Sequence, residues 1–124
     1  MKKLVYIAGP INASGVFDMY RNLRHFFEAE RELLQLGFAP INPAADFTAL
    51  MMMGDERVSS DLWTKMLMTK DEPLVKRSDA LFLLPGWRRS LGAQKEVFWA
   101  EEACVPWFET YASLTAAFTG SRRA

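Results

Sequence analysis

The stretch that decides the fold is LVYIAGP, residues 4–10. Its first five residues form an unbroken apolar run, which is typical of a β-strand buried on both faces, and the glycine and proline that follow end the strand. Strands of this kind lie at the centre of parallel sheets that helices cover on both sides. We therefore expect residues 4–8 to form the central strand of such a sheet.

Outward from this strand, helical and strand-like segments alternate. The first helix is predicted at residues 17–36, where apolar residues recur at helical spacing, with Asp18 as a candidate N-cap and Gly37 at the C′ position. The stretch that leads to residue 59 has weak periodicity and an apolar run at residues 50–53, which favours a lid or a surface that contacts a partner. Further strands are predicted at residues 38–41, 80–84 and 105–108, and further helices at residues 59–68, 73–78, 91–104 and 110–118.

This order of elements determines the fold class. Parallel strands that are joined through helices by right-handed crossovers give an open sheet with helices on both faces. With 124 residues, 50% of them hydrophobic, the chain is sized for one core. We therefore predict an α/β fold: a single three-layer domain over residues 1–124, Rossmann- or flavodoxin-like, with a small parallel sheet of about four to five strands.

Composition limits the class of ligand. The chain has 15 lysine and arginine residues and 15 aspartate and glutamate residues, so it has no net field that would hold polymeric nucleic acid or an acidic membrane. A small molecule is the expected ligand. The N-terminus has neither the long apolar run of an anchor nor the cleavage site of a signal peptide, so we expect a cytoplasmic protein.

Metal and redox chemistry have little support in the sequence. Cys104 is the one cysteine, so the chain can form neither an internal disulfide nor a cysteine-rich zinc site, and its place on the apolar side of a predicted helix favours core packing. His25 stands beside two phenylalanines and is the one histidine. We therefore predict no metal and no cofactor.

Two loops are candidates for ligand binding, because ligands of such sheets bind beyond the carboxyl ends of the strands, near the point where the strand order reverses. They are residues 9–15 and residues 85–90. The first is rich in small and turn-forming residues but matches neither the P-loop nor the dinucleotide-binding pattern; it begins with Gly9, Pro10, Ile11 and Asn12. The second contains Gly86 and Trp87, an unusual pair for a mere connection.

The helix that follows the second loop carries the main catalytic candidate, Glu96. Ser90 stands at the N-cap of this helix, and Glu96 lies in its second turn, on a side that can face the sheet edge. Gly92 is costly inside a helix, which suggests that something packs closely against it. The alternative is that Ser90 only caps the helix and that Glu96 is a solvated residue paired with a lysine.

Three further polar residues have competing interpretations. Asp71 precedes Pro73, and its position alone is better explained by an N-cap than by chemistry. Asp79 stands just before a strand, at the opposite end of the sheet from the candidate loops, so we interpret it as structural. Tyr6, taken by itself, is a core residue of the buried strand.

Together these segments resemble the nucleoside 2-deoxyribosyltransferase-like family, including its 2′-deoxynucleoside 5′-phosphate N-hydrolase branch and a related group found in phages and bacteria. The matching segments are VYIAGPI at 5–11, Asn42-Pro43, Asp71 with Asp79, LLPGW at 83–87 and SxGAxxE at 90–96. The resemblance implies that Glu96 attacks the anomeric carbon of a sugar and forms a covalent glycosyl-enzyme. It also implies that Asp71 handles the proton of the departing base and that Tyr6 orients the carboxylate of Glu96.

The same resemblance bears on the substrate. The transferase branch has an aspartate near the sugar 5′ position where this chain and the N-hydrolase branch have a serine, Ser90. A serine hydroxyl at a helix N-terminus can bind a 5′-phosphate that a carboxylate would repel. The N-hydrolase branch has an arginine at about the position of Asn12, and we expect Arg88 or Arg89 to take over its charge. The implied substrate contacts are Gly9, Pro10, Ile11, Asn12, Gly86, Trp87, Ser90 and Gly92.

We therefore expect an N-glycoside hydrolase that acts on a (2′-deoxy)nucleoside 5′-monophosphate without a cofactor. The main rival hypothesis is a nucleoside 2-deoxyribosyltransferase, in which a second base replaces water. The pattern also fits a non-catalytic nucleotide-binding or phage–host interaction module, and an NAD-type glycohydrolase. The resemblance further implies a homodimer or larger homo-oligomer, for which residues 51–53 or 111–118 offer apolar surfaces.

Overall fold

The computed structural model describes residues 1–11, 13–53 and 60–121, without the side chains at 49–53, 60–64, 66–68, 120 and 121. Its sheet is parallel, in the order β2-β1-β3-β4, and consists of β1 (Leu4–Ala8), β2 (Ala39–Ile41), β3 (Ala80–Leu83) and β4 (Trp107–Phe108). β1 pairs with β2 on one side and with β3 on the other. The predicted parallel α/β class and the central place of residues 4–8 are therefore confirmed.

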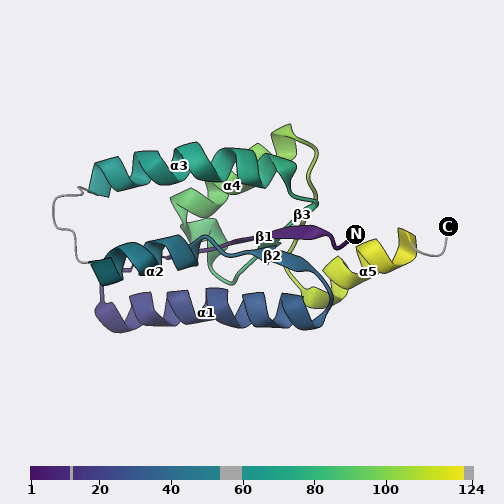
Figure 1. Ribbon diagram of the computed structural model, residues 1–124, viewed down its shortest axis with the longest axis horizontal. Helices are drawn as coiled ribbons and strands as arrows, with labels where there is room; N and C mark the ends of the chain where they lie inside the picture. Colours follow the sequence, from purple (N-terminus) through teal and green to yellow (C-terminus); the bar gives the residue numbers. More distant parts are fainter. Residues whose placement is uncertain (12, 54–59, 122–124) are drawn as a thin grey trace.

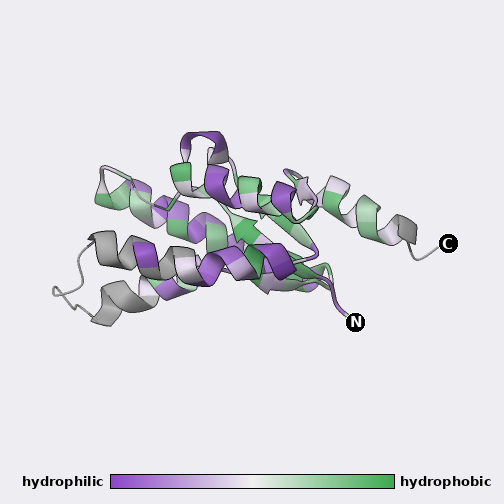
Figure 2. Ribbon diagram, turned by 90° about the horizontal axis from the view of Figure 1, so that it is seen from above, coloured by the Kyte–Doolittle hydropathy of each residue, from purple (hydrophilic) through white to green (hydrophobic). Residues whose placement is uncertain are grey.

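Helices cover both faces of this sheet (Figure 1). The side chains of Val5 and Ile7 belong to the core that includes α1 (Val16–Gln35) and α5 (Tyr111–Ser121). Tyr6 and Ala8 alternate to the other face, where they pack with α3 (Ser60–Arg77) and α4 (Leu91–Glu102). The strands are hydrophobic, and hydrophilic residues gather on the outer sides of the helices (Figure 2). The domain thus has the three predicted layers.

The segment between β2 and β3 differs from the prediction. The stretch expected to form a lid or partner surface begins with α2 (Ala44–Met53), and the two helices predicted at residues 59–68 and 73–78 are one helix, α3. Pro73 lies inside α3, where it removes a backbone hydrogen bond at a cost of about 3 kcal/mol. Packing outweighs that cost, because buried residues recur at helical spacing on both sides of the proline. They are Asp71, Val75 and Ser78.

α1 begins earlier than predicted. Gly15 is its N-cap, with extended backbone, and the Gly15 carbonyl accepts the Met19 N–H at 3.0 Å. Asp18, the predicted N-cap, lies in the first helical turn and pairs with Arg21 at 3.5 Å. The Asp18 carboxylate still stabilises α1 from that position, since the first turn is the positive end of the helix dipole.

α1 and α4 end with the same turn. Gly37 follows α1 with a left-handed backbone (φ 92°), as predicted for a C′ glycine. Cys104 takes the equivalent place after α4, also left-handed (φ 58°), and Val105 N–H donates to the Ala100 carbonyl at 2.8 Å. This turn buries Val105 and exposes Cys104. The prediction of core packing for Cys104 is wrong because α4 ends at Glu102, before that residue.

α5 uses its apolar side chains within the domain. Tyr111 stacks on Phe82, with ring centroids 4.5 Å apart, and Leu114 is fully buried. Phe118 meets Phe38 edge-on at 5.9 Å. These contacts leave less apolar surface on residues 111–118 for the predicted contact between copies, and the side chains at 51–53, the other predicted surface, lie outside the described ones.

Candidate active site

Two loops meet at the carboxyl edge of the sheet, where β1 and β3 end. The chain turns from β1 to α1 on one face and from β3 to α4 on the other, so the strand order reverses between these strands. The Leu84 N–H donates to the Ala8 carbonyl at 2.9 Å. A Cβ on Gly9 would lie 2.8 Å from Leu84 Cβ, and a Cβ on Gly86 would lie 3.6 Å from Pro10 Cγ. The two predicted loops therefore lie against each other.

Tyr6 lies in β1, beneath these loops. Its side chain is fully buried on the face covered by α3 and α4, and its hydroxyl has no hydrogen-bond partner of ordinary geometry among the described residues. Burial, and after it the charges of Glu96 and Asp71, raise the pKa of this phenol far above its ordinary value of 10.0. The hydroxyl therefore stays protonated and can donate a hydrogen bond to a carboxylate or to a ligand.

Asp71 comes to the same face of the sheet from α3. It continues the buried stripe of Val75 and Ser78 and is 8% exposed. The interpretation of Asp71 as an N-cap before Pro73 is wrong, because both residues lie inside a continuous helix. Asp71 Oδ1 is buried without a hydrogen-bond partner in the described part of the chain. An unpaired carboxylate oxygen in such a place is costly unless it serves a ligand or a reaction.

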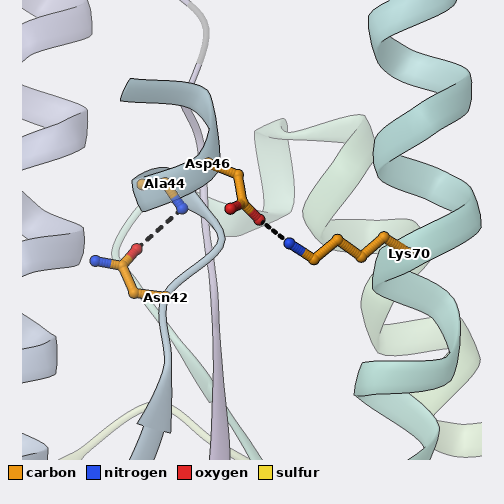
Figure 3. A network of polar contacts seen from close by, with 4 residues as sticks. All are labelled: Asn42, Ala44, Asp46 and Lys70. Carbon is orange, nitrogen blue, oxygen red and sulfur yellow. Dashed lines mark hydrogen bonds and ion pairs between the residues drawn. The ribbon is translucent and has the colours of Figure 1, made fainter. Parts of the chain in front are cut away.

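Two charged residues act on Asp71 from close by. Asn42 Oδ1 accepts the Ala44 N–H at 2.9 Å and so fixes the start of α2, and Asp46 stands in the first turn. Lys70 Nζ donates to Asp46 Oδ2 at 2.6 Å, which joins α2 to α3 (Figure 3). Burial and then the Asp46 charge raise the pKa of Asp71 from 3.8 to about 6, against the opposing effect of Lys70.

Glu96 joins this group from α4. It neighbours the buried residues Ala93 and Val97 on its helix; the residue as a whole is half-buried, and its carboxyl group is the part that lies inside. Burial is the main cause that raises the pKa of Glu96 from 4.5 to about 8; Asp71 adds to the rise, and the Tyr6 hydroxyl opposes it. A solvated surface glutamate would not have such a pKa. The structure thus brings together three of the predicted site residues, from β1, α3 and α4.

The second loop, residues 85–90, is held in place by contacts with Glu109. Gly86 has a left-handed backbone (φ 85°), and Trp87 is buried, with its indole N–H donating to Glu109 Oε1 at 2.7 Å. The guanidinium of Arg88 lies 4.5 Å from the Trp87 ring centroid and 3.3 Å from the Glu109 carboxylate. Arg89 is exposed and forms no ion pair with any residue that the structure describes. Of the two arginines, Arg89 is the one available to an anion.

The start of α4 is the other polar part of this edge. Ser90 is its N-cap, as predicted, and the Ser90 hydroxyl oxygen accepts the Ala93 N–H at 3.2 Å. A Cβ on Gly92 would meet the Ser90 hydroxyl oxygen at 3.9 Å and no other atom more closely. Close packing of protein against Gly92, which the sequence suggested, is therefore absent from the described residues, and Gly92 is exposed.

The first loop is described on both sides of Asn12, which itself lies outside the described residues. Gly9 is buried and has no room for a side chain against Leu84. Pro10 and Ile11 are partly buried, and Asn22 Nδ2 donates to the Ile11 carbonyl at 3.3 Å, which ties the loop to α1. These contacts position the loop, and its predicted role in binding stays a prediction.

Sequence reasoning missed Asp46 and Lys70. One local signal was present: Asn42-Pro43 is a strong start signal for a helix, because asparagine caps a helix and proline suits its first turn. A helix that starts there carries Asp46 in its first turn. The contact with Lys70 has no local signal, since it depends on how α2 and α3 pack.

Residues away from the site include Asp79 and His25. Asp79 Oδ2 accepts the Leu4 N–H at 2.7 Å, at the end of the sheet opposite the loops, which confirms its structural interpretation. His25 is a partly buried residue of α1. Within the described ranges, no three histidine, cysteine, aspartate or glutamate side chains gather as they would around a metal ion. No helix in those ranges has the length and apolar character needed to span a membrane.

Comparison with known proteins adds the fold relationship and the family. No curated protein matches the chain. The solved structure of a 2-deoxyribosyltransferase from the psychrotolerant bacterium Bacillus psychrosaccharolyticus is similar, with a TM-score of 0.62 and 20% sequence identity over 84% of this chain and 69% of that chain. This likeness shows a shared fold. Residues 3–107 match the model of the family described as "Domain of unknown function (DUF4406)", so the chain belongs to that family.

Proposed function

We propose that this protein hydrolyses the N-glycosidic bond of a (2′-deoxy)nucleoside 5′-monophosphate and releases a free base and a sugar 5-phosphate. The observation that carries the proposal is the convergence of Tyr6, Asp71 and Glu96 from three elements on one face of the sheet. A pair of carboxyl groups, one acting as nucleophile and the other as acid and base, is the equipment that glycoside cleavage uses. The resemblance to the N-hydrolase branch supports the same residues.

In the first step, the ionised Glu96 carboxylate attacks C1′ of the sugar while the bond between C1′ and the base nitrogen breaks. Asp71 gives its proton to the departing base, which leaves neutral. In the second step, water attacks C1′, the ester to Glu96 breaks, and Asp71 takes the proton of the water. We assign to the Tyr6 hydroxyl a hydrogen bond to Glu96 that forms as this carboxyl group ionises and that orients it. A 2′-deoxy sugar suits this route, since a 2′-hydroxyl destabilises the cationic transition state.

The pKa values of the two carboxyl groups bear on this mechanism. With a pKa of about 8 for Glu96 and about 6 for Asp71, the empty site at pH 7 favours a protonated Glu96 and an ionised Asp71. The productive form, with the proton on Asp71, is then the minority form of the empty site at pH 7. Positive charge that develops on the sugar stabilises the ionised Glu96, so the reaction draws on this minority form.

The 5′-phosphate is assigned to the start of α4. The first N–H groups of a helix have no partner within the helix and attract anions, and α4 spans Leu91–Glu102. Ser90 still has its O–H to donate, because its oxygen only accepts from Ala93. Gly92 leaves the approach to this end open. Arg89 supplies the charge, since Arg88 is already held by Trp87 and Glu109.

A second candidate is base exchange, in which another nucleobase resolves the glycosyl intermediate in place of water. The fold shared with a 2-deoxyribosyltransferase favours it. The two reactions have the same first step and differ only in the acceptor of the second. Incubation of one deoxynucleotide or deoxynucleoside with a different free base separates them, because only exchange yields a new nucleoside.

The test is a screen of nucleosides and nucleoside 5′-monophosphates for released base. We expect release from a monophosphate by the wild type, none by Glu96→Ala, and wild-type release by Glu101→Ala, an exposed residue of the same helix. Binding of the nucleotide by Glu96→Ala, measured by calorimetry, shows that the variant keeps its site. Nucleotide binding without release by the intact protein would instead support a non-catalytic binding module.

A further inference from the structure

The ion pair between Asp46 and Lys70 occupies an unusual position. It joins α2 to α3 by a hydrogen bond between described side chains, with 2.6 Å between Lys70 Nζ and Asp46 Oδ2. Lys70 directly precedes Asp71, and Asp46 stands just after the capped start of α2, which Asn42 holds (Figure 3). Both side chains are about half exposed, so the pair by itself contributes little to stability. Its proximity to a buried carboxyl group calls for another explanation.

Asp71 faces charged or titratable groups from each element around it. Asp46 approaches from α2, Tyr6 from β1 and Glu96 from α4, while Lys70 lies on the same helix. The negative charge of Asp46 favours the protonated form of Asp71, and the positive charge of Lys70 favours the ionised form. The ion pair holds these two opposite charges together beside the helix that carries Asp71.

We propose that Asp46 and Lys70 are positioning residues that together set the pH at which Asp71 holds its proton. This proposal rests on the proposed function in one respect, namely that Asp71 is the proton donor of the reaction. The electrostatic effect of Asp46 and Lys70 on Asp71 exists whether or not a substrate is cleaved. The Asp46 charge adds to the larger effect of burial and so increases the fraction of Asp71 that is protonated near neutral pH. Lys70 holds that charge in place and limits its effect.

The two single substitutions separate an electrostatic role from a structural one. Asp46→Asn and Lys70→Met both break the same ion pair, so a purely structural role predicts the same change from each. An electrostatic role predicts opposite changes: Asp46→Asn lowers the titration midpoint of Asp71 and Lys70→Met raises it, each by about half a pH unit, or about threefold in protonated fraction. The double variant should return close to the wild type.

The measurement is a ¹³C NMR titration of the Asp71 side-chain carboxyl, assigned by its loss in Asp71→Asn. Glu72→Gln is the matched control: Glu72 follows Asp71 directly and pairs with Lys76 at 3.6 Å, so its removal also takes one acidic partner from an ion pair of α3. We expect no shift from it. Lys70→Arg keeps the charge and should keep the wild-type midpoint.

Shifts of the same sign in the two single variants, or no shift in either, would overturn the inference. Opposite shifts without any base release would support it while the proposed function fails. If base is released, the pH profile of kcat/KM adds a second reading: the limb that belongs to Asp71 should move in the direction seen by NMR in each variant. If the Asp71 limb of the kcat/KM profile stays fixed while the NMR midpoint of Asp71 moves, the role of Asp46 and Lys70 in catalysis is refuted.

Discussion

Replacing Glu96 by glutamine should stabilise the protein at alkaline pH and leave its stability at acid pH almost unchanged. Burial raises the pKa of Glu96 from 4.5 to about 8 in the folded chain. Between these values the native state binds a proton that the unfolded chain releases, so the free energy of unfolding falls as the pH rises. The penalty is complete above the folded pKa. Glutamine has no charge to bury, so Glu96→Gln escapes it.

The size of the effect follows from the same two values. Each pH unit between them lowers the free energy of unfolding by about 1.4 kcal/mol. From pH 5 to pH 9 the loss amounts to about 4 kcal/mol for a fully shielded carboxyl group and to about 2 kcal/mol when solvent screens part of the charge. We therefore expect Glu96→Gln to exceed the wild type by about 2 to 5 kcal/mol at pH 9, and by less than about 1 kcal/mol at pH 5.

Urea unfolding followed by tryptophan fluorescence at both pH values measures this difference, provided that the m-value stays constant. Glu101→Gln is the control, since Glu101 is an exposed acid of the same helix and should give no gain at either pH. An equal gain for Glu96→Gln at pH 5 and pH 9 would point to packing instead of charge. No gain at pH 9 would refute the burial of the Glu96 carboxyl and, with it, the main support for the site.

Three further predictions concern other parts of the chain. Cys104→Gly should raise the free energy of unfolding by about 0.5 to 1 kcal/mol, because glycine adopts the left-handed backbone without strain. Gly37→Ala should lower the free energy of unfolding by about 1 kcal/mol for the converse reason. Thermal unfolding of both variants measures these changes, with Cys104→Ala as a neutral reference. Arg89→Ala should raise KM for a nucleoside 5′-monophosphate at least tenfold and leave that for the nucleoside unchanged, and a rise for both substrates would contradict a phosphate contact. The pH profile of kcat/KM should be bell-shaped, with limbs near 6 and 8, the values to which the pKa of Asp71 and the pKa of Glu96 are raised; a profile that is flat from pH 5 to 9 speaks against the carboxyl pair.

Local signals predicted most of the fold. The apolar run at residues 4–8 with the glycine and proline after it gave the central strand, and Gly37 gave the end of α1, because each depends on a few neighbouring residues. The errors came where packing decides. Pro73 is tolerated inside α3 because that helix keeps its buried stripe, and Cys104 is exposed because α4 ends in a turn that buries the next residue.

The site divides in the same way. The place of Glu96 and Ser90 at the start of a helix after a strand could be predicted, since the spacing is local. Asp71 could not be placed from its sequence neighbours, because its direction depends on whether the helix continues through Pro73. The effect of Asp46 on it depends on the packing of two helices, and no pattern within either helix predicts that.

The contact between the two loops has a consequence for the redesign of this protein. Gly9 fits against Leu84 with no space for even a methyl group, and Gly86 lies beside Pro10. A loop transplanted from a relative with a side chain at the position of Gly9 would therefore collide with Leu84 in the loop that remains. Anyone who wishes to change the substrate preference should treat residues 9–15 and 84–90 as one interchangeable module, carried on a sheet and helices that need not change.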